Sequence, residues 1–328
     1  MSKNIIICYD GTGNEYGKNN TNVVKTFESI VRDEKQVAFY DPGVGTFSYL
    51  GRNLGKGVGK ILGLAFGAGL QQNLEDGYEY LMNRFEKDDK VFIFGFSRGA
   101  YTARALAVMI YRFGILQKGS KNLIPYVSNM YIKRKFDLCG DFEDSFCQPC
   151  EPHFIGVWDT VGSMGLFWGK KFFDQKLNPD ILNAFHAMSI DEKRKKFPVN
   201  MWDENAKQPH QNMEQVWFTG VHSDVGGYYD ERGLSDIAFA WMMDKAMECG
   251  MIIKDNWKDS LVQDCTDKLH NSRKSFYKLW KKVQRDIPDD AKIHKSVFDR
   301  IREVEDYKPK NINEAHLSHA VSNESYTA

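Results

Sequence analysis

A short apolar run that leads directly into a glycine-flanked serine constrains this chain more than any other feature. Residues 91–94 are Val-Phe-Ile-Phe, and Gly95-Phe96-Ser97-Arg98-Gly99 follows them at once. A helical pattern of apolar residues then continues to about Gly114. The glycines two positions before and after the serine remove side chains that would crowd a sharp turn. The pattern therefore predicts a strand, a sharp turn and a helix that expose Ser97 as a nucleophile.

Short apolar runs elsewhere predict further buried strands, and helical patterns separate them. The runs lie at 4–9, 37–40, 154–158 and 216–218. Helical spacing of apolar residues falls at 23–32, 70–85 and 235–246, with Ser235 as the expected cap of the last helix. This alternation of strand and helix is typical of an α/β fold with a mostly parallel sheet and helices on both faces.

Polar residues follow the carboxyl ends of these strands, where catalytic groups of open α/β sheets gather. The first strand ends at Asp10-Gly11-Thr12, the third at Asp159 and the fourth just before His222. With Ser97, this gives the chain order serine, aspartate, histidine, which is the order in α/β-hydrolases. The fold class that we predict is therefore α/β-hydrolase-like, with cap-like insertions.

The chemistry of such a triad assigns a role to each residue. A serine hydroxyl needs a base to take its proton, and His222 is the candidate, oriented by Asp159. The oxyanion of the tetrahedral intermediate needs donors already in place. The amide of Arg98 is expected to supply one donor, and an amide at Gly11 or Thr12 the other.

Other residues compete for these roles. Asp224, two residues after His222, is the rival acid, and Asp10 is a further acidic candidate at a strand end. His294 is the rival base, although a histidine among apolar residues is more often a buried structural side chain. Ser97 could also be only a helix-start serine, and Asp159 only the cap of a turn.

The whole chain, 1–328, is predicted to form a single domain. Insertions are expected at about 43–70, 115–150 and 164–212, and a helical carboxyl-terminal part at 250–328. In the first insertion, glycines recur every fourth residue (Gly55, Gly59, Gly63 and Gly67). On a helix this spacing makes a smooth face, which fits either a mobile lid or lipid-facing helix over the site, or a tightly packed segment.

Composition excludes several classes of protein. Forty-four basic residues balance forty-four acidic ones, so bulk charge indicates no nucleic-acid partner. No signal peptide and no apolar run of membrane-spanning length are present.

Six scattered cysteines fit an intracellular chain. Cys139, Cys147, Cys150 and His153 could hold zinc, but paired Cys-x-x-Cys halves are absent, which favours loop cysteines without a metal. We expect no cofactor.

Six motifs in order resemble one known family. They are residues 8–14 (CYDGTGN), 41–46 (DPGVGT), 95–101 (GFSRGAY), 157–162 (VWDTVG), 220–227 (GVHSDVGG) and 293–297 (IHKSV). Together they resemble the type VI secretion phospholipase effector-like catalytic domain over nearly the whole chain, from Lys3 to about Asn311.

The resemblance implies an α/β-hydrolase whose triad positions match Ser97, Asp159 and His222. Characterised members are antibacterial effectors that remove acyl chains from phospholipids, whereas many others are solitary bacterial proteins with unknown substrates. The expected function is a serine esterase or lipase with a transient membrane contact and an immunity or delivery partner. It would be cytoplasmic in the producing cell and could be delivered to another cell without a signal peptide. We expect no large carboxyl-terminal membrane-binding portion of the kind those effectors carry, so a hydrolase of small soluble esters and a weak binding or regulatory module remain alternatives.

Overall fold

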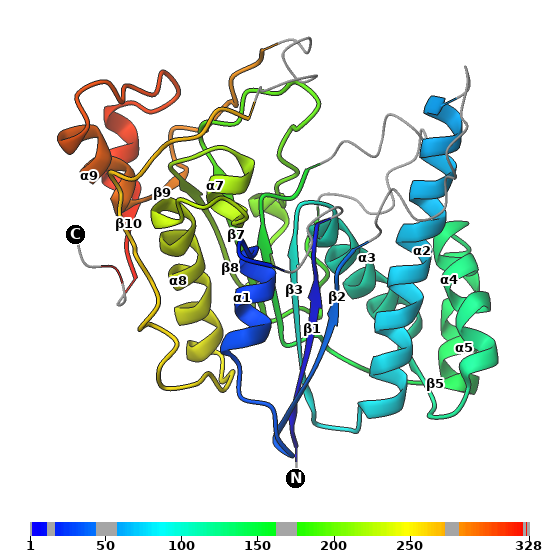
Figure 1. The fold of residues 1–328 in the computed structure, drawn as a ribbon. Helices are drawn as coiled ribbons and strands as arrows, with labels where there is room; N and C mark the ends of the chain where they lie inside the picture. The colour runs from blue at the N-terminus through cyan, green and yellow to red at the C-terminus, as the bar shows by residue number, and fades with distance from the viewer. Residues whose placement is uncertain are drawn as a thin grey trace.

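The computed structural model describes residues 2–11, 17–43, 58–161, 176–272, 282–323 and 326. Within these residues an eight-stranded sheet forms the centre of the molecule, with helices on both faces (Figure 1). Every strand pair described in this sheet is parallel. The mostly parallel α/β architecture predicted from the sequence is thus confirmed.

The order of the strands places a switch point beside the predicted elbow. The order is β10-β9-β8-β7-β6-β3-β1-β2, so the chain builds outward from β1 in one direction to β2 and in the other through β3. Ligands of open α/β sheets bind outside the carboxyl ends of the strands at such a point. The strands are β1 (Asn4–Tyr9), β2 (Gln36–Asp41), β3 (Lys90–Phe96), β6 (Phe154–Trp158), β7 (Asn183–Ser189), β8 (Asn212–Phe218), β9 (Lys292–His294) and β10 (Ala320–Val321).

Two apolar cores cover the two faces of the sheet. In β1, Ile5 and Ile7 pack into one core, and Ile6 and Cys8 into the other. Both faces are therefore buried, which is why these strands read as continuous apolar runs instead of alternating ones. Helices α2 (Val58–Arg84), α3 (Arg98–Phe113), α4 (Ile124–Ile132) and α5 (Cys139–Phe146) cover the first face, and α1 (Asn22–Ser29) and α8 (Gly233–Glu248) the second (Figure 1).

Residues 115–150 form a helical insertion on the first face. Strands β4 (Ile115–Leu116) and β5 (Cys147–Gln148) pair antiparallel at its base, and α4 and α5 lie between them in sequence. Tyr131 and Phe142 pack from these helices into the first core. The insertion therefore contributes to the domain core as well as to the surface.

The segment 164–212, predicted as a cap-like insertion, contains a central strand of the sheet. Strand β7 pairs with β6 on one side and β8 on the other, and its residues from Ala184 onward are buried. Its sequence, NAFHAMS, includes the polar His186 and Ser189, so it lacks the apolar run that marks the other strands. The prediction missed it because its polar side chains bond to partners inside the fold: His186 Nε2 accepts from the Thr160 amide, and the Ser189 hydroxyl accepts from Arg285.

Of the described residues in 250–328, where a helical part was predicted, only α9 (Lys295–Glu303) and the 3₁₀ helix η5 (Glu314–His319) form regular helices. Beyond α8 the chain forms turns to residue 272, then β9, helix α9 (Lys295–Glu303) and β10. Aspartates hold these turns: Thr266 donates to Asp264, and Gly233 to Asp267. Short acidic side chains compete with helix formation by bonding nearby backbone amides. Helix α8 begins at Gly233, with Arg232 and not Ser235 at the cap.

Part of the glycine-rich segment lies in α2. Gly59, Gly63 and Gly67 fall within this helix, whereas Gly55 is outside the described residues, so the lid role stays a prediction. No described helix is both long and apolar enough to cross a bilayer.

Candidate active site

Ser97 sits on the sharp turn that the sequence predicted. It lies between β3 and α3 with φ 57° and ψ −116°, a left-handed conformation that is rare for a residue with a side chain. A Cβ at Gly95 would lie 2.5 Å from the carbonyl oxygen of Gly99, and one at Gly99 only 2.1 Å from that of Tyr9. Both positions therefore require glycine, because a side chain would collide with nearby backbone. Gly99 in particular lets the start of α3 lie directly against the end of β1.

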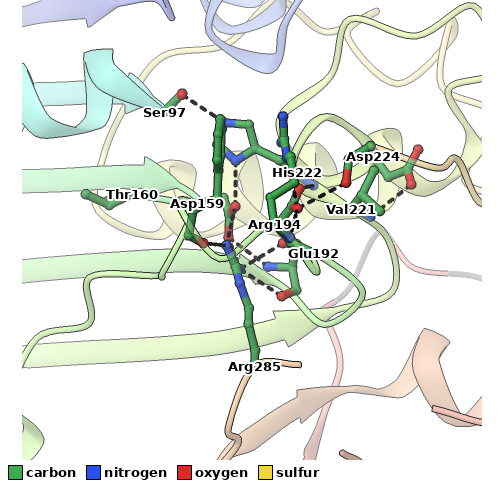
Figure 2. A network of polar contacts seen from close by, with 12 residues as sticks. Ser97, Asp159, Thr160, Glu192, Arg194, Val221, His222, Asp224 and Arg285 are labelled. Atoms are coloured by element: carbon green, nitrogen blue, oxygen red, sulfur yellow. Dashed lines mark hydrogen bonds and ion pairs between the residues drawn. The ribbon is translucent and has the colours of Figure 1, made fainter. Parts of the chain in front are cut away.

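Ser97, His222 and Asp159 form a continuous hydrogen-bonded relay, shown in Figure 2. The Nε2 atom of His222 is 2.8 Å from Ser97 Oγ, and its Nδ1 atom is 2.6 Å from Asp159 Oδ2. With a proton on Nδ1, the ring donates to Asp159 and leaves Nε2 to accept from the serine hydroxyl. The arrangement can remove the proton of Ser97 and stabilise the imidazolium that results.

Helix α7 (His222–Gly226) holds the histidine. Its first turn is fixed because the Asp224 carboxylate accepts from the Val221 amide at 2.9 Å. A Cβ at Gly226 would lie 2.0 Å from the ring of Phe96, so α7 packs directly on the residue before Ser97. The His222 ring contacts the rings of Phe96 and Phe197, whose centroids are 4.7 and 5.2 Å away. These contacts leave the ring little freedom to turn away from the serine.

Asp159 is fully buried and held on both oxygens. It follows β6 directly, with φ 41°, and its Oδ1 atom accepts from the Ser189 amide at 3.0 Å. Arg285 donates to the same carboxylate through Nη1 and Nη2 (Figure 2). Burial alone would raise the pKa of Asp159, but the Arg285 charge and the bond from His222 hold that pKa well below its usual range.

A second ion pair lies behind the histidine backbone. Both carboxylate oxygens of Glu192 accept hydrogen bonds from the Arg194 guanidinium. The Oε2 atom of Glu192 also accepts from the His222 amide at 3.4 Å. Burial would raise the pKa of Glu192, but Arg194 lowers it below the usual value. The Arg194 guanidinium also lies 3.6 Å from the centre of the Phe197 ring. The pair therefore supports the wall against which His222 packs.

Asp224 and His294, the rival acid and base, lie apart from the relay. Asp224 Oδ1 is 2.6 Å from Nδ1 of His270, and the opposite nitrogen of that ring faces Glu231. His294 is fully buried, caps α9 and contacts Ser296 and Asn323. Neither residue is described in contact with Ser97 or His222.

The predicted oxyanion donors divide into three cases. Arg98 is the first residue of α3, where backbone N–H groups point out of the helix end beside the serine. The Gly11 amide instead donates to Oδ1 of Asp10 at 2.6 Å, so in this state it is engaged and not directed at an oxyanion. Thr12 lies outside the described residues. Asp10 also accepts from Thr21 and Tyr40, and so fixes the junction of β1 and α1.

The cysteines and histidine considered for zinc are spread out. Cys147 lies in β5, and the Nε2 atom of His153 contacts the Cys249 carbonyl at 2.9 Å. Across the described ranges, no group of three or more His, Cys, Asp or Glu side chains is arranged to hold a metal ion.

Two arginines beside the relay could not be recognised from the sequence. Arg285 lies in a charged stretch (WKKVQRD), 126 residues from Asp159. Arg194 lies within the basic run Lys193–Lys196, and such a run is more often a solvated face than a site. The pair of Arg285 with Asp159 is long-range and leaves no local periodicity, so only the identity of the buried acid, Asp159, could have prompted a search for a cation.

The chain also matches a protein-family model. The model described as "T6SS, Phospholipase effector Tle1-like, catalytic domain" matches residues 3–245, which is more than half of the chain. The chain belongs to this family. Its match contains Ser97, Asp159 and His222 but ends before His270 and Arg285.

Individual relatives of this Tle1-like chain are longer. "Uncharacterized protein YEL023C" of Saccharomyces cerevisiae is 31% identical over 217 residues, 60% of this chain and 32% of the yeast protein. The matched region thus spans about a third of that relative's length. The crystal structure of an uncharacterised Pseudomonas aeruginosa protein has a TM-score of 0.45 at 20% identity, over 78% of this chain and 47% of that one. The structure of the Tle1 effector bound to the VgrG spike of the type 6 secretion system has a TM-score of 0.43 at 18% identity, over 70% of this chain and 52% of that one.

Proposed function

We propose that this protein is a serine hydrolase that cleaves carboxylic esters of lipids, with phospholipids as its substrate class. The observation that carries the chemistry is the relay from Ser97 Oγ through His222 to the buried Asp159. The description of the family to which the chain belongs names a phospholipase effector, which supports a lipid ester over other acyl substrates.

The reaction proceeds in two halves. His222 takes the proton of Ser97 while Ser97 Oγ attacks the acyl carbon. The carbonyl electrons move onto the carbonyl oxygen, and the Arg98 amide stabilises the resulting oxyanion. As the carbonyl re-forms, the ester C–O bond breaks and the leaving alcohol receives the proton from His222. Water then attacks the acyl-enzyme by the same route, which releases a fatty acid and restores Ser97.

The first test is Ser97→Ala. Phospholipid vesicles are incubated with the wild type and the variant, and lipids are measured by mass spectrometry. We expect the wild type to convert diacyl lipid to lysolipid and free fatty acid, and the variant to lose at least about 1,000-fold in rate. Ser318→Ala, which removes an exposed hydroxyl, is the matched control and should retain full activity.

Two outcomes would redirect the proposal. A wild type that reacts with a fluorophosphonate probe and cleaves short-chain esters but not vesicles would be a hydrolase of small soluble esters. A chain whose Ser97 stays unlabelled would be a binding or regulatory module. Delivery into another cell, with a delivery or immunity partner, is a separate proposal that follows from the family description, and a killing assay with the Ser97→Ala strain tests it.

A further inference from the structure

A buried guanidinium binds the acid of the relay. Arg285 Nη1 lies 2.5 Å from Asp159 Oδ1, and Nη2 lies 3.0 Å from Oδ2. Oδ2 is also the oxygen that His222 Nδ1 contacts at 2.6 Å. Carboxylate, imidazole and guanidinium therefore form one buried unit, in which two donors share a single carboxylate oxygen (Figure 2).

The same guanidinium fixes the surrounding backbone. Nη1 donates to the carbonyl and hydroxyl oxygens of Ser189, each at 2.8 Å, and Nη2 to the carbonyl of Phe197 at 3.0 Å. Ser189 ends β7, and the ring of Phe197 packs on His222. A fork with several planar donors can hold all these acceptors at once, which a lysine cannot. Arg285 thereby fixes both the plane of the Asp159 carboxylate and one wall of the His222 site.

Two other buried carboxylates near His222 are bound to partners of their own. Glu192 is paired with Arg194, and Asp224 with the ring of His270. His186 in β7 is neutral at physiological pH, because burial, together with the Arg104 charge, lowers its pKa to about 3. The balance between Asp159 and Arg285 is therefore the main electrostatic influence on the His222 ring from these groups.

We propose that Arg285 is a positioning residue of the relay: it fixes the Asp159 carboxylate for His222 and takes up part of its negative charge. This inference rests on the proposed hydrolase function. A carboxylate that interacts with His222 alone would stabilise the imidazolium more strongly. By sharing the carboxylate, Arg285 leaves less of its negative charge for the imidazolium, and its own positive charge repels that cation.

The test compares Arg285→Met with Arg300→Met across the pH profile of kcat/KM on a short-chain aryl ester. Arg300 is a matched control, because it is buried and donates to the carbonyls of Cys265 and Asp267, away from the relay. Loss of Arg285 should move the acidic limb upward by about one pH unit or more and lower kcat. The Arg300 variant should leave the limb in place.

A purely structural role for Arg285 would lower kcat equally at every pH, so an unmoved limb in Arg285→Met overturns the proposal. If circular dichroism shows that this variant does not fold, Arg285→Lys decides. The lysine keeps the charge but loses the fork, so we expect kcat to fall about ten-fold with KM nearly unchanged. A lysine variant with wild-type kcat would overturn the proposal.

A readout independent of activity separates this inference from the proposed function. The Nδ1 proton of His222 can be followed by NMR and assigned by its absence in His222→Gln. Its titration midpoint should rise by about one unit in Arg285→Met, even if no ester is hydrolysed. An unchanged midpoint contradicts the role of Arg285, whereas a wild type inactive on every ester contradicts only the proposed function.

Discussion

Two buried aspartates bind a histidine at the same distance, 2.6 Å, yet their surroundings differ. Asp159 binds a histidine whose other nitrogen faces Ser97, and its second partner is Arg285. Asp224 binds His270, whose other nitrogen faces Glu231. The distance between acid and imidazole thus does not distinguish a relay from a structural pair. The group on the far side of the imidazole does.

This difference predicts opposite effects for two identical substitutions. Asp159→Asn should lower kcat by about 10³–10⁴-fold, because an amide at this position favours the wrong histidine tautomer. Asp224→Asn should keep kcat within about ten-fold but lower the free energy of unfolding by ~1–3 kcal/mol, since Asp224 joins the cap of α7 to His270. Ester hydrolysis and urea unfolding measure both effects. Equal losses of kcat in the two variants would show that Asp224 belongs to the relay.

The elements at the elbow touch through backbone, so their packing tolerates no added methyl group. Gly99→Ala would place its Cβ 2.1 Å from the Tyr9 carbonyl oxygen, and α3 could relieve this contact only by moving off β1. We expect a loss of about 3 kcal/mol or more in the free energy of unfolding, and slower fluorophosphonate labelling of Ser97.

Gly140→Ala is the control for the elbow. Gly140 lies in α5 with nothing within 4 Å of an added Cβ, so alanine should stabilise the chain by up to about 1 kcal/mol through its helix propensity. If urea unfolding gave the same change for both alanine variants, close backbone contact would not be what requires Gly99.

The elements that could be predicted are those whose pattern is local. The strands β1, β3 and β6 are apolar runs between helical patterns, and each is followed directly by a residue that the sequence singled out: Asp10, Ser97 and Asp159. Strand β7 could not be predicted, because the hydrogen-bond partners of its buried His186 and Ser189, Thr160 and Arg285, are far away in sequence. Arg285 escaped prediction for the same reason, since its role depends on an acid 126 positions away.

Across the whole molecule, the candidate site extends beyond the residues that the family model matches. That match ends at residue 245, whereas His270, Arg285 and the strands β9 and β10 follow it. Strand β9 pairs with β8, and Ile293 packs with Trp217 and Val297 in a third apolar cluster beside it. The last part of the chain therefore both extends the sheet and completes the surroundings of Asp159.

A chain shortened to residues 1–250, which keeps α8 whole, should consequently fail as a folded enzyme. It would expose one edge of β8 and Trp217, which is fully buried in the complete chain, and it would leave Asp159 buried without Arg285. A buried carboxylate that has lost its guanidinium partner and an open apolar edge both favour unfolding and aggregation. We expect loss of cooperative urea unfolding and of Ser97 labelling by fluorophosphonate. Arg285→Met in the full chain separates the two causes, because it removes the guanidinium and keeps the strands. Cooperative unfolding and full labelling of 1–250 would show that the first 250 residues hold a complete site.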